Sequence, residues 1–284
     1  MDIPTIKASE WIYPLDTLGK TATVYSVSEY MLNLKIGNRL VNITNFSEYL
    51  SSFGISFPKE QFKQAISFIR PGNIVKIRAD QLVIYSREGV HSLFFKDVET
   101  VSLKLSDFDL TQAPYKRLRK ILAKKNLDQL IGLTKEPRAE ELFVKLSTAK
   151  DLSIEQWQEI LTYFIGRGKG STPSGDDIIT AYYAMLVIQK DPKAKTLGQA
   201  LQAFDLAKTT LLSQSYLQGV IEGHVNSFLY QLFDDLATDA SDEQMNRDVE
   251  RLMYIGHSSG KDMSFGLFLG LGREEDGSKN EKSE

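Results

Sequence analysis

The strongest constraint on the fold is the stretch of residues 166–177, which reads G-R-G-K-G-S-T-P-S-G-D-D and precedes almost purely apolar sequence up to residue 188. Glycine allows backbone N–H groups to approach a ligand closely. Ser174 is typical of a helix N-cap, which puts Asp176 and Asp177 in the first helical turn. The pattern predicts a polar loop that leads into a buried helix, whose free N–H groups suit an anion. The alternative is a capped turn that binds nothing.

A second segment repeats this pattern near the end of the chain. The Ser-Gly-x-Asp core at residues 174–177 occurs again at residues 259–262, and both copies lead into apolar sequence. A predicted helix precedes each copy, with apolar residues at helical spacing. The first of these helices starts at a capping-box sequence at Ser153 and the second at Ser241, and each ends at a glycine. We therefore expect two helix N-termini to meet over one ligand, unless the repeat of short motifs is a coincidence.

The glycine-rich loop does not match the common nucleotide-binding motifs. Its spacing is G-x-G-x-G, which is neither a P-loop nor the dinucleotide fingerprint G-x-G-x-x-G. Both of those motifs follow a β-strand, whereas residues 154–165 have a helical period. This disfavours the usual nucleotide-binding folds.

The two motifs resemble a known bacterial family. The G-x-G-x-G-x-T-P-S-G-D-D element and the later G-H-S-S-G-x-D-x-x-x-G element are similar to those of the AllH-like family, as is the block from Thr210 to Ser213 with Gly219 and Gly223. The resemblance covers about residues 166–271. It implies a subunit of oxamate carbamoyltransferase, an enzyme of allantoin and purine breakdown in nitrogen metabolism, that works with other subunits.

The chain departs from the family pattern inside the first loop. Arg167, Lys169 and Ser171 stand where the family usually has apolar residues or proline. The loop is therefore more basic than that of its relatives. One interpretation is that Arg167 and Lys169 contact phosphate or carboxylate oxygens of a ligand. The alternative is that both side chains are solvated at the surface and contact no ligand.

Composition excludes several classes of protein. The 284 residues are 42% hydrophobic and 25% charged, and the net charge of −3 gives no general attraction to nucleic acid. The absence of cysteine excludes disulfides, thiolate catalysis and cysteine metal sites, and it favours a reducing cytoplasm. The start of the chain lacks the apolar core of a signal peptide, and no apolar run predicts a membrane span. We therefore expect a cytoplasmic protein without nucleic-acid or membrane partners.

The chain is expected to be α+β, with a β-rich barrel or sandwich-like domain at residues 1–110, a helical domain at 111–272 and a disordered polar tail at 273–284. Strands are predicted at residues 22–27, 32–36, 40–43, 74–77, 82–85, 92–95 and 98–105, with a helix at 58–69. Helices are predicted at residues 115–127, 139–147, 154–165, 176–189, 196–212, 216–236, 242–254 and 262–271.

The adjacent carboxylates of Asp176 and Asp177 pose an electrostatic problem, because they repel an anion. Mg²⁺ between the carboxylates and a phosphate would resolve it, with Asp176, Asp177 and Asp262 as ligands. A ligand amide whose N–H groups need acceptors would resolve it too. In the third alternative the carboxylates cap free helix N–H groups and touch no ligand. No other cofactor is expected.

Histidine is the remaining candidate for proton transfer. His257 lies in the second glycine loop, and histidine is the side chain best suited to proton transfer near neutral pH. The alternative is a polar turn residue. His224 is expected in a helix that could reach the same centre, but a core or surface role is favoured. His91 lies in a predicted strand, and no candidate catalytic partner is recognised near it. The basic stretch from Lys116 to Lys125 is expected to be solvated or to contact another subunit.

One function is favoured for the chain, and two alternatives remain. The resemblance implies a small anionic metabolite, with carbamoyl phosphate and an oxamate-like acceptor as substrates and Asp177, Asp262 and His257 as catalytic residues. The ligand-binding residues would be Arg167, Gly168, Lys169, Gly170, Thr172, Ser174, Gly175, Asp176, Ser259 and Gly260. The alternatives are a Mg²⁺-dependent phosphoryl-transfer enzyme or phosphatase, and a non-catalytic metabolite sensor.

Overall fold

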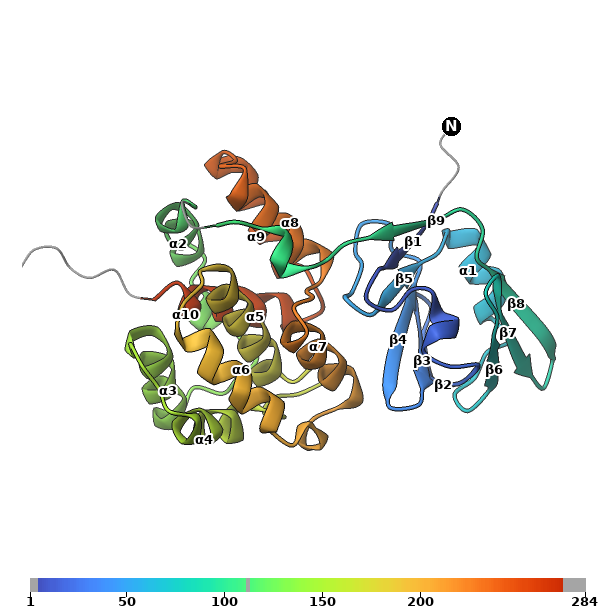
Figure 1. The fold of residues 1–284 in the computed structure, drawn as a ribbon, viewed down its shortest axis with the longest axis horizontal. Coiled ribbons are helices and arrows are strands. Elements are labelled where there is room, and N and C mark those ends of the chain that lie inside the picture. Colours follow the sequence, from blue (N-terminus) through green and yellow to red (C-terminus); the bar gives the residue numbers. More distant parts are fainter. Residues whose placement is uncertain (1–4, 111–112, 273–284) are drawn as a thin grey trace, which may run out of the picture. The chain divides into compact units, whose positions relative to one another are not determined.

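The chain divides into two compact units, one built on a sheet and one built of helices (Figure 1). The computed structural model describes residues 5–110 and 113–272. The sheet unit comprises residues 1–108 and 211–234, and the helical unit comprises 109–210 and 235–284. The fold is α+β, as expected. The expected division was a single boundary near residue 110, whereas the structure also groups residues 211–234 with the sheet.

Within residues 5–110, the sheet unit contains nine strands in one sheet that curls into a half-barrel (Figure 1). The strands are β1 (Ile6–Ser9), β2 (Thr21–Val27), β3 (Met31–Ile36), β4 (Arg39–Thr44), β5 (Gly54–Ser56), β6 (Ile74–Ile77), β7 (Gln81–Ser86), β8 (Gly89–Phe94) and β9 (Val98–Val101). Their order is β8-β7-β6-β2-β3-β4-β5-β1-β9. The pairs β1–β9 and β4–β5 are parallel, and the other pairs are antiparallel. The short strands β1 and β5 were not predicted from the sequence.

Two tight turns set the register of the antiparallel strands. Ile36 pairs with Arg39, so the β3–β4 hairpin has a two-residue turn in which Gly37 has φ +57°. Positive φ is the conformation that such hairpin turns require. Ser86 pairs with Gly89 across the β7–β8 turn in the same way.

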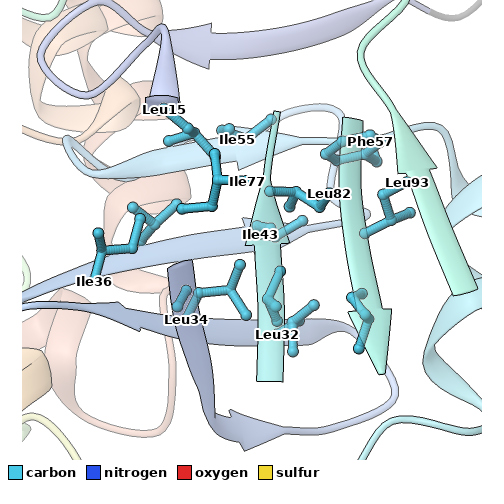
Figure 2. Packing of buried hydrophobic residues seen from close by; sticks show 14 of the residues in the cluster. Leu15, Leu32, Leu34, Ile36, Ile43, Ile55, Phe57, Ile77, Leu82 and Leu93 are labelled. Carbon is cyan, nitrogen blue, oxygen red and sulfur yellow. The ribbon is translucent and has the colours of Figure 1, made fainter. Parts of the chain in front are cut away.

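Buried aliphatic side chains form the core of the sheet unit. Figure 2 shows them gathered on one face of the strands, with Leu32 and Leu34 of β3, Ile43 of β4 and Leu82 of β7 among them. All four are fully buried. Burying one such side chain contributes about 1.5–3 kcal/mol relative to leaving it exposed, so this cluster stabilises the curled sheet. The predicted helix near residues 58–69 is α1 (Lys59–Ile66), which packs Phe62 into the same core.

Two helices from the second half of the chain complete the sheet unit: α7 (Leu211–Ile221) and most of α8 (Ser227–Ala237). The ring of Tyr216 in α7 packs edge-on against Phe53 at 4.8 Å. The prediction of one helix over residues 216–236 was wrong, because the chain turns between the two. Gly223 adopts φ +85°, and the Asn226 side chain accepts from the backbone N–H groups of Phe228 and Leu229 at 3.1 Å. Asn226 therefore caps a new helix.

The helical unit contains α2 (Tyr115–Ala123), α3 (Pro137–Thr148), α4 (Ile154–Phe164), α5 (Ser174–Ile188), α6 (Lys193–Ala203), α9 (Asp242–Met253) and α10 (Ser259–Gly270). The prediction of a helix over residues 196–212 was wrong in its second half. Helix α6 ends at Ala203, and the Asp205 side chain then accepts from the Ala207 N–H to start a short 3₁₀ turn.

Helices α5 and α10 form the centre of the helical unit and pack side by side (Figure 1). Nearly every residue of α5 is buried, as expected for a helix that is apolar all round. A Cβ on Gly266 would overlap the carbonyl oxygen of Ile178, and one on Gly270 would lie 2.9 Å from the side chain of Met185. These contacts run in the same order along both helices, so the helices are parallel and their N-termini lie at the same end.

No helix in the described part of the chain is both long and apolar enough to cross a membrane. The tail at residues 273–284, expected to be disordered, lies outside the described residues.

The close approach of α5 and α10 predicts a strong effect of Gly266→Ala. The added methyl group meets backbone rather than a movable side chain. We expect the variant to lose about 1–3 kcal/mol of unfolding free energy, as for overpacking in a dense core. Urea unfolding measures this loss. The control is Gln199→Ala at an exposed position of α6, expected within about 0.5 kcal/mol of the original chain.

Glycine is a poor helix former, so alanine alone would stabilise the helix by about 1 kcal/mol. An unfolding free energy equal to or above that of the original chain would therefore contradict the close contact.

Candidate functional site

The first glycine-rich loop connects α4 to α5. The predicted capping box at Ser153 starts α4, and Gly166 leaves its C-terminus with φ +80°. Gly168 has φ +128° and lies so close to the start of α5 that a Cβ there would be 2.5 Å from the backbone nitrogen of Ser174. Only glycine fits this position easily. The loop therefore folds back over the beginning of α5.

Ser174 is not the N-cap of α5, so that prediction was wrong. Pro173 occupies the N-cap position with φ −54° and ψ 138°, and Ser174 is the first helical residue. Proline suits the position because its φ is fixed near this value. The Ser174 hydroxyl is consequently released from capping. It is buried and has no hydrogen-bond partner of normal geometry among the described residues.

The sequence repeat is also a structural repeat. A Cβ on Gly175 would overlap the carbonyl oxygen of Phe164 at the end of α4. A Cβ on Gly260 would overlap the carbonyl oxygen of Leu252 near the end of α9. In both copies the glycine of the Ser-Gly-x-Asp core therefore lets the new helix start directly against the preceding helix.

The two loops meet, as the repeat predicted. The hydroxyl groups of Thr172 and Ser259, one from each loop, are 2.6 Å apart. Gly132 lies against both helix starts, because its Cβ would overlap the Ser174 hydroxyl and lie 2.8 Å from the Ser258 hydroxyl. The N-termini of α5 and α10 thus converge on one place within the helical unit.

Asp176 has a structural role in the loop. Its Oδ1 accepts from the Gly166 backbone N–H at 2.8 Å, and its Oδ2 accepts from the Thr209 hydroxyl. The carboxylate therefore ties the start of the loop and the segment before α7 to the first turn of α5. Both of its oxygens are used by the chain.

Asp177 and Asp262 are the corresponding aspartates of the two copies, and both are buried. Burial raises the pKa of the Asp177 carboxyl well above its ordinary range, while the hydroxyls of Ser259 and Thr172 oppose this and the nearby carboxylates add to it. Burial also raises the pKa of Asp262. The Gly132 N–H donates to its Oδ1 at 2.8 Å, and this hydrogen bond opposes the rise in pKa. Each aspartate is thus placed beside the hydroxyl groups at the helix starts.

Several buried polar atoms at this junction lack a partner. They are Oδ2 of Asp177, Oδ2 of Asp262 and Oγ of Ser174, none of which makes a hydrogen bond of normal geometry among the described residues. The hydroxyls of Ser174 and Ser258 still lie close enough to Asp262 to act against the rise of its pKa. A buried polar group without a partner costs about 1–3 kcal/mol, so three together mark an unusual place in the structure. We call Asp177, Asp262 and Ser174 the acidic cluster.

The backbone N–H groups expected to bind an anion are partly used. The Gly175 N–H donates to the Arg167 carbonyl at 2.9 Å, and the Gly260 N–H donates to the Ile255 carbonyl at 2.9 Å. The first turns of the two helices therefore offer fewer free donors than the sequence suggested.

The charged residues of the loops lie at the surface. Arg167 forms an ion pair with Glu136 at 3.0 Å, and its guanidinium lies 4.0 Å from the ring centre of Tyr163. Lys169 is exposed, and neither an ion pair nor a hydrogen bond of its side chain is found in the described part. Gly170, beside it, has φ +90°. Lys169 is thus the loop cation available to a ligand.

The histidines do not join the acidic cluster. His257 is exposed at the surface of the second loop. His224 lies in the turn between α7 and α8, not within a helix as predicted, and its ring stacks on Trp11 at 5.4 Å in the sheet unit. Burial lowers the pKa of His224. His91 stacks on Phe68 in the sheet unit at 4.8 Å.

Two contributors to the site were missed in the sequence. Gly132 is a lone glycine between predicted helices, and nothing in its surroundings marks it. Thr209 precedes a family-like block but lies 33 positions from Asp176, to which it donates. Among residues 5–110 and 113–272, no group of three or more His, Cys, Asp or Glu side chains is arranged to hold a metal ion.

The fold and site define an α+β protein whose helical unit pairs two glycine-led helix starts over buried aspartates. The family model described as oxamate carbamoyltransferase subunit AllH matches residues 164–271. This range includes both loops and the helices α5 and α10, so the resemblance seen in the motifs is confirmed there. No solved structure matches the chain.

The raised pKa of Asp177 predicts a distinctive pH dependence of stability. An aspartate with a raised folded pKa binds its proton more tightly in the folded state, so the unfolding free energy falls as pH rises from about 4 through that pKa. Asp177→Asn cannot be charged. We expect the variant to be more stable than the original chain at pH 8, by about 1–3 kcal/mol, and the difference to shrink toward pH 4.

Thermal and urea unfolding between pH 4 and pH 8 test this. Asp151→Asn, at an exposed position, removes the same charge and should leave the pH profile unchanged. A constant difference across the pH range would show that the Asp177 carboxyl does not titrate abnormally.

Proposed function

We propose that the chain is a subunit of a carbamoyltransferase-like enzyme that moves a carbamoyl group between phosphate and an oxamate-like acceptor. The match to the AllH family model supports this class of protein. The acidic cluster lies within the matched range. The other subunits of the enzyme are then the protein partners, and the reaction belongs to nitrogen and purine catabolism.

The observation that carries the proposal is the set of unpartnered acceptor oxygens on Asp177 and Asp262. A carbamoyl or oxamate group carries amide N–H donors, which need such acceptors. The two oxygens come from parallel helices that start at the same place, so one ligand amide can meet both. The Ser174 hydroxyl can donate to the carbonyl oxygen of the same ligand.

A shared proton removes the conflict between buried carboxylates and an anionic ligand. Burial raises the pKa of both Asp177 and Asp262, and the Asp262 charge raises the pKa of Asp177 further. A protonated carboxyl donates to a ligand oxygen, while its neighbour accepts from a ligand N–H. The cluster then recognises both edges of an amide without two negative charges facing the ligand.

Gly132 marks the side from which a ligand reaches the cluster. It is exposed, whereas the carboxylate that accepts from its N–H is buried. Because Gly132 lies against the starts of both helices, its segment must shift for a ligand to contact Asp177 or Asp262. Binding would therefore order or displace the residues around Gly132.

The phosphate part of the substrate is proposed to lie at the glycine loop. Lys169 supplies the charge, and the glycines Gly168 and Gly170 with Thr172 supply close backbone and hydroxyl groups. In the reaction the amide nitrogen of the acceptor attacks the carbamoyl carbon, the bond from that carbon to the phosphate oxygen breaks, and the nitrogen gives up a proton. The proposed proton acceptor is His257, an exposed residue of the second loop.

The competing proposal places Mg²⁺ between the carboxylates and a phosphate. Asp176 is already bonded to Gly166 and Thr209, which leaves Asp177 and Asp262 as the available carboxylates. The amide proposal needs no third carboxylate ligand. This is why we favour it over a phosphatase or phosphoryl-transfer enzyme.

The first experiment separates amide recognition from metal binding. Oxamate, carbamoyl phosphate and phosphate are titrated into the original chain and into Asp177→Asn by calorimetry, with and without EDTA. We expect Asp177→Asn to weaken oxamate binding by about 1–3 kcal/mol, because the amide loses a carboxyl partner. Phosphate binding should persist, because the phosphate is proposed to lie at the glycine loop. EDTA should have little effect. Asp151→Asn is the control for the loss of a surface charge.

Loss of phosphate binding on chelation would support the metal proposal instead. If Asp177→Asn changes neither ligand, the carboxyl only supports the helix starts. Binding without turnover, even with the other subunits present, would indicate a metabolite sensor.

The second experiment tests the role of Lys169. Lys169→Ala should weaken carbamoyl phosphate binding by about 1–3 kcal/mol, the range for hydrogen bonds to charged groups, and should leave oxamate binding nearly unchanged. Arg167→Ala is the matched comparison, since Arg167 is engaged by Glu136 and Tyr163. Equal losses in both variants would mean that the loop acts through its overall charge rather than through Lys169.

A further inference from the structure

A hollow in the surface borders the second loop. It has a volume of about 530 Å³ and is bordered by residues from the ends of α2 and α9 and from the start of α10. The lining residues are Lys125, Glu250, Met253, Tyr254, Gly256 and Lys261. Pockets of about 300–1,000 Å³ hold ligands of metabolite size, so the hollow is large enough for one. None of its lining residues belongs to the acidic cluster.

The residues that line the hollow carry a net charge of +1, from Lys125, Lys261 and Glu250. Lys125 forms an ion pair with Glu250 at 2.7 Å, and hydrogen bonding to Lys125 lowers the pKa of Glu250. Lys261 instead donates to the carbonyl oxygen of His257 at 2.9 Å, and no ion pair of Lys261 occurs in the described structure. The hollow therefore attracts an anion.

Lys261 is the position at which the two copies of the structural repeat differ in charge. It follows Gly260 in the second copy, where the first copy has Asp176 after Gly175. Asp176 is buried and bonded on both oxygens, whereas Lys261 is half-buried at the edge of the hollow. The first copy thus uses this position to hold its own loop, and the second copy turns a cation toward the surface.

An aromatic ring lines the same hollow. Tyr254 is 87% exposed, the highest value among the exposed large hydrophobic residues of the described chain. Its neighbour Met253 supplies a soft apolar surface in the same hollow. An exposed aromatic face next to a lysine suits a ligand with a flat ring and a negative group, because the ring stacks while the charge pairs.

We propose that this hollow binds a nucleoside monophosphate, with the base against Tyr254 and the phosphate at Lys261. The size of the hollow, the positive net charge of its lining residues and its exposed ring fit a ligand that combines a base with one phosphate. The site is separate from the acidic cluster and does not depend on the proposed transfer reaction. A nucleotide bound in the hollow would occupy a site other than the acidic cluster.

Calorimetric titration of the full chain with AMP, adenosine and ribose 5-phosphate tests the proposal. We expect AMP to bind more tightly than either fragment. Lys261→Ala should weaken AMP binding about tenfold, as for loss of a charged partner, and should leave adenosine unaffected. Tyr254→Ala should weaken AMP and adenosine but not ribose 5-phosphate, and Tyr254→Phe should restore binding because the ring remains.

The control is Lys120→Ala, an exposed lysine of α2 that does not line the hollow. Melting curves confirm that each variant is folded, which is expected because Tyr254 is at the surface. Absence of AMP binding to the folded chain would overturn the proposal. So would equal losses in Lys261→Ala and Lys120→Ala, which would indicate attraction by overall charge.

Discussion

The close packing of α5 against α10 is the interaction on which the rest of the helical unit depends. Two parallel helices can approach this closely only where one of them lacks side chains, and Gly266 and Gly270 provide that gap. The same requirement recurs at the helix starts, where Gly175 and Gly260 lie against carbonyl oxygens of the preceding helices. In the helical unit, glycine residues therefore set how closely the helices approach one another. In the sheet unit, large apolar side chains fill the space between the packed elements.

Sequence reasoning identified the helix starts and the pairing of the loops because both depend on local chemistry. Glycine turns, capping boxes and apolar periodicity act over a few residues, and they predicted α4, α5, α9 and α10 well. The placement of Gly132 could not be predicted, since it depends on contacts between segments distant in sequence. Ser174 was misassigned because Pro173 competes for the cap position. The break at Gly223 was hidden by apolar sequence on both sides.

The buried carboxyl groups of the site differ in how fully the chain satisfies them. Asp176 shows that the chain can satisfy a buried carboxylate fully when its purpose is structural. Asp177 and Asp262, at corresponding positions of the two copies, each keep one oxygen without a hydrogen bond among the described residues. That contrast within one site, rather than the glycine loop alone, favours ligand recognition. The family match over residues 164–271 indicates the same class of protein from independent evidence.

The division of the chain has a consequence for any attempt to study its parts. The backbone passes between the two units near residues 108, 210 and 234, so each unit is assembled from two separate stretches of sequence. The matched range of residues 164–271 contains the inserted stretch 211–234 but lacks the sheet against which α7 packs its tyrosine. A fragment limited to residues 164–271 would therefore contain α7 and α8 without the sheet unit to which residues 211–234 belong. Isolating the helical unit instead requires joining residue 210 to residue 235 with a short linker.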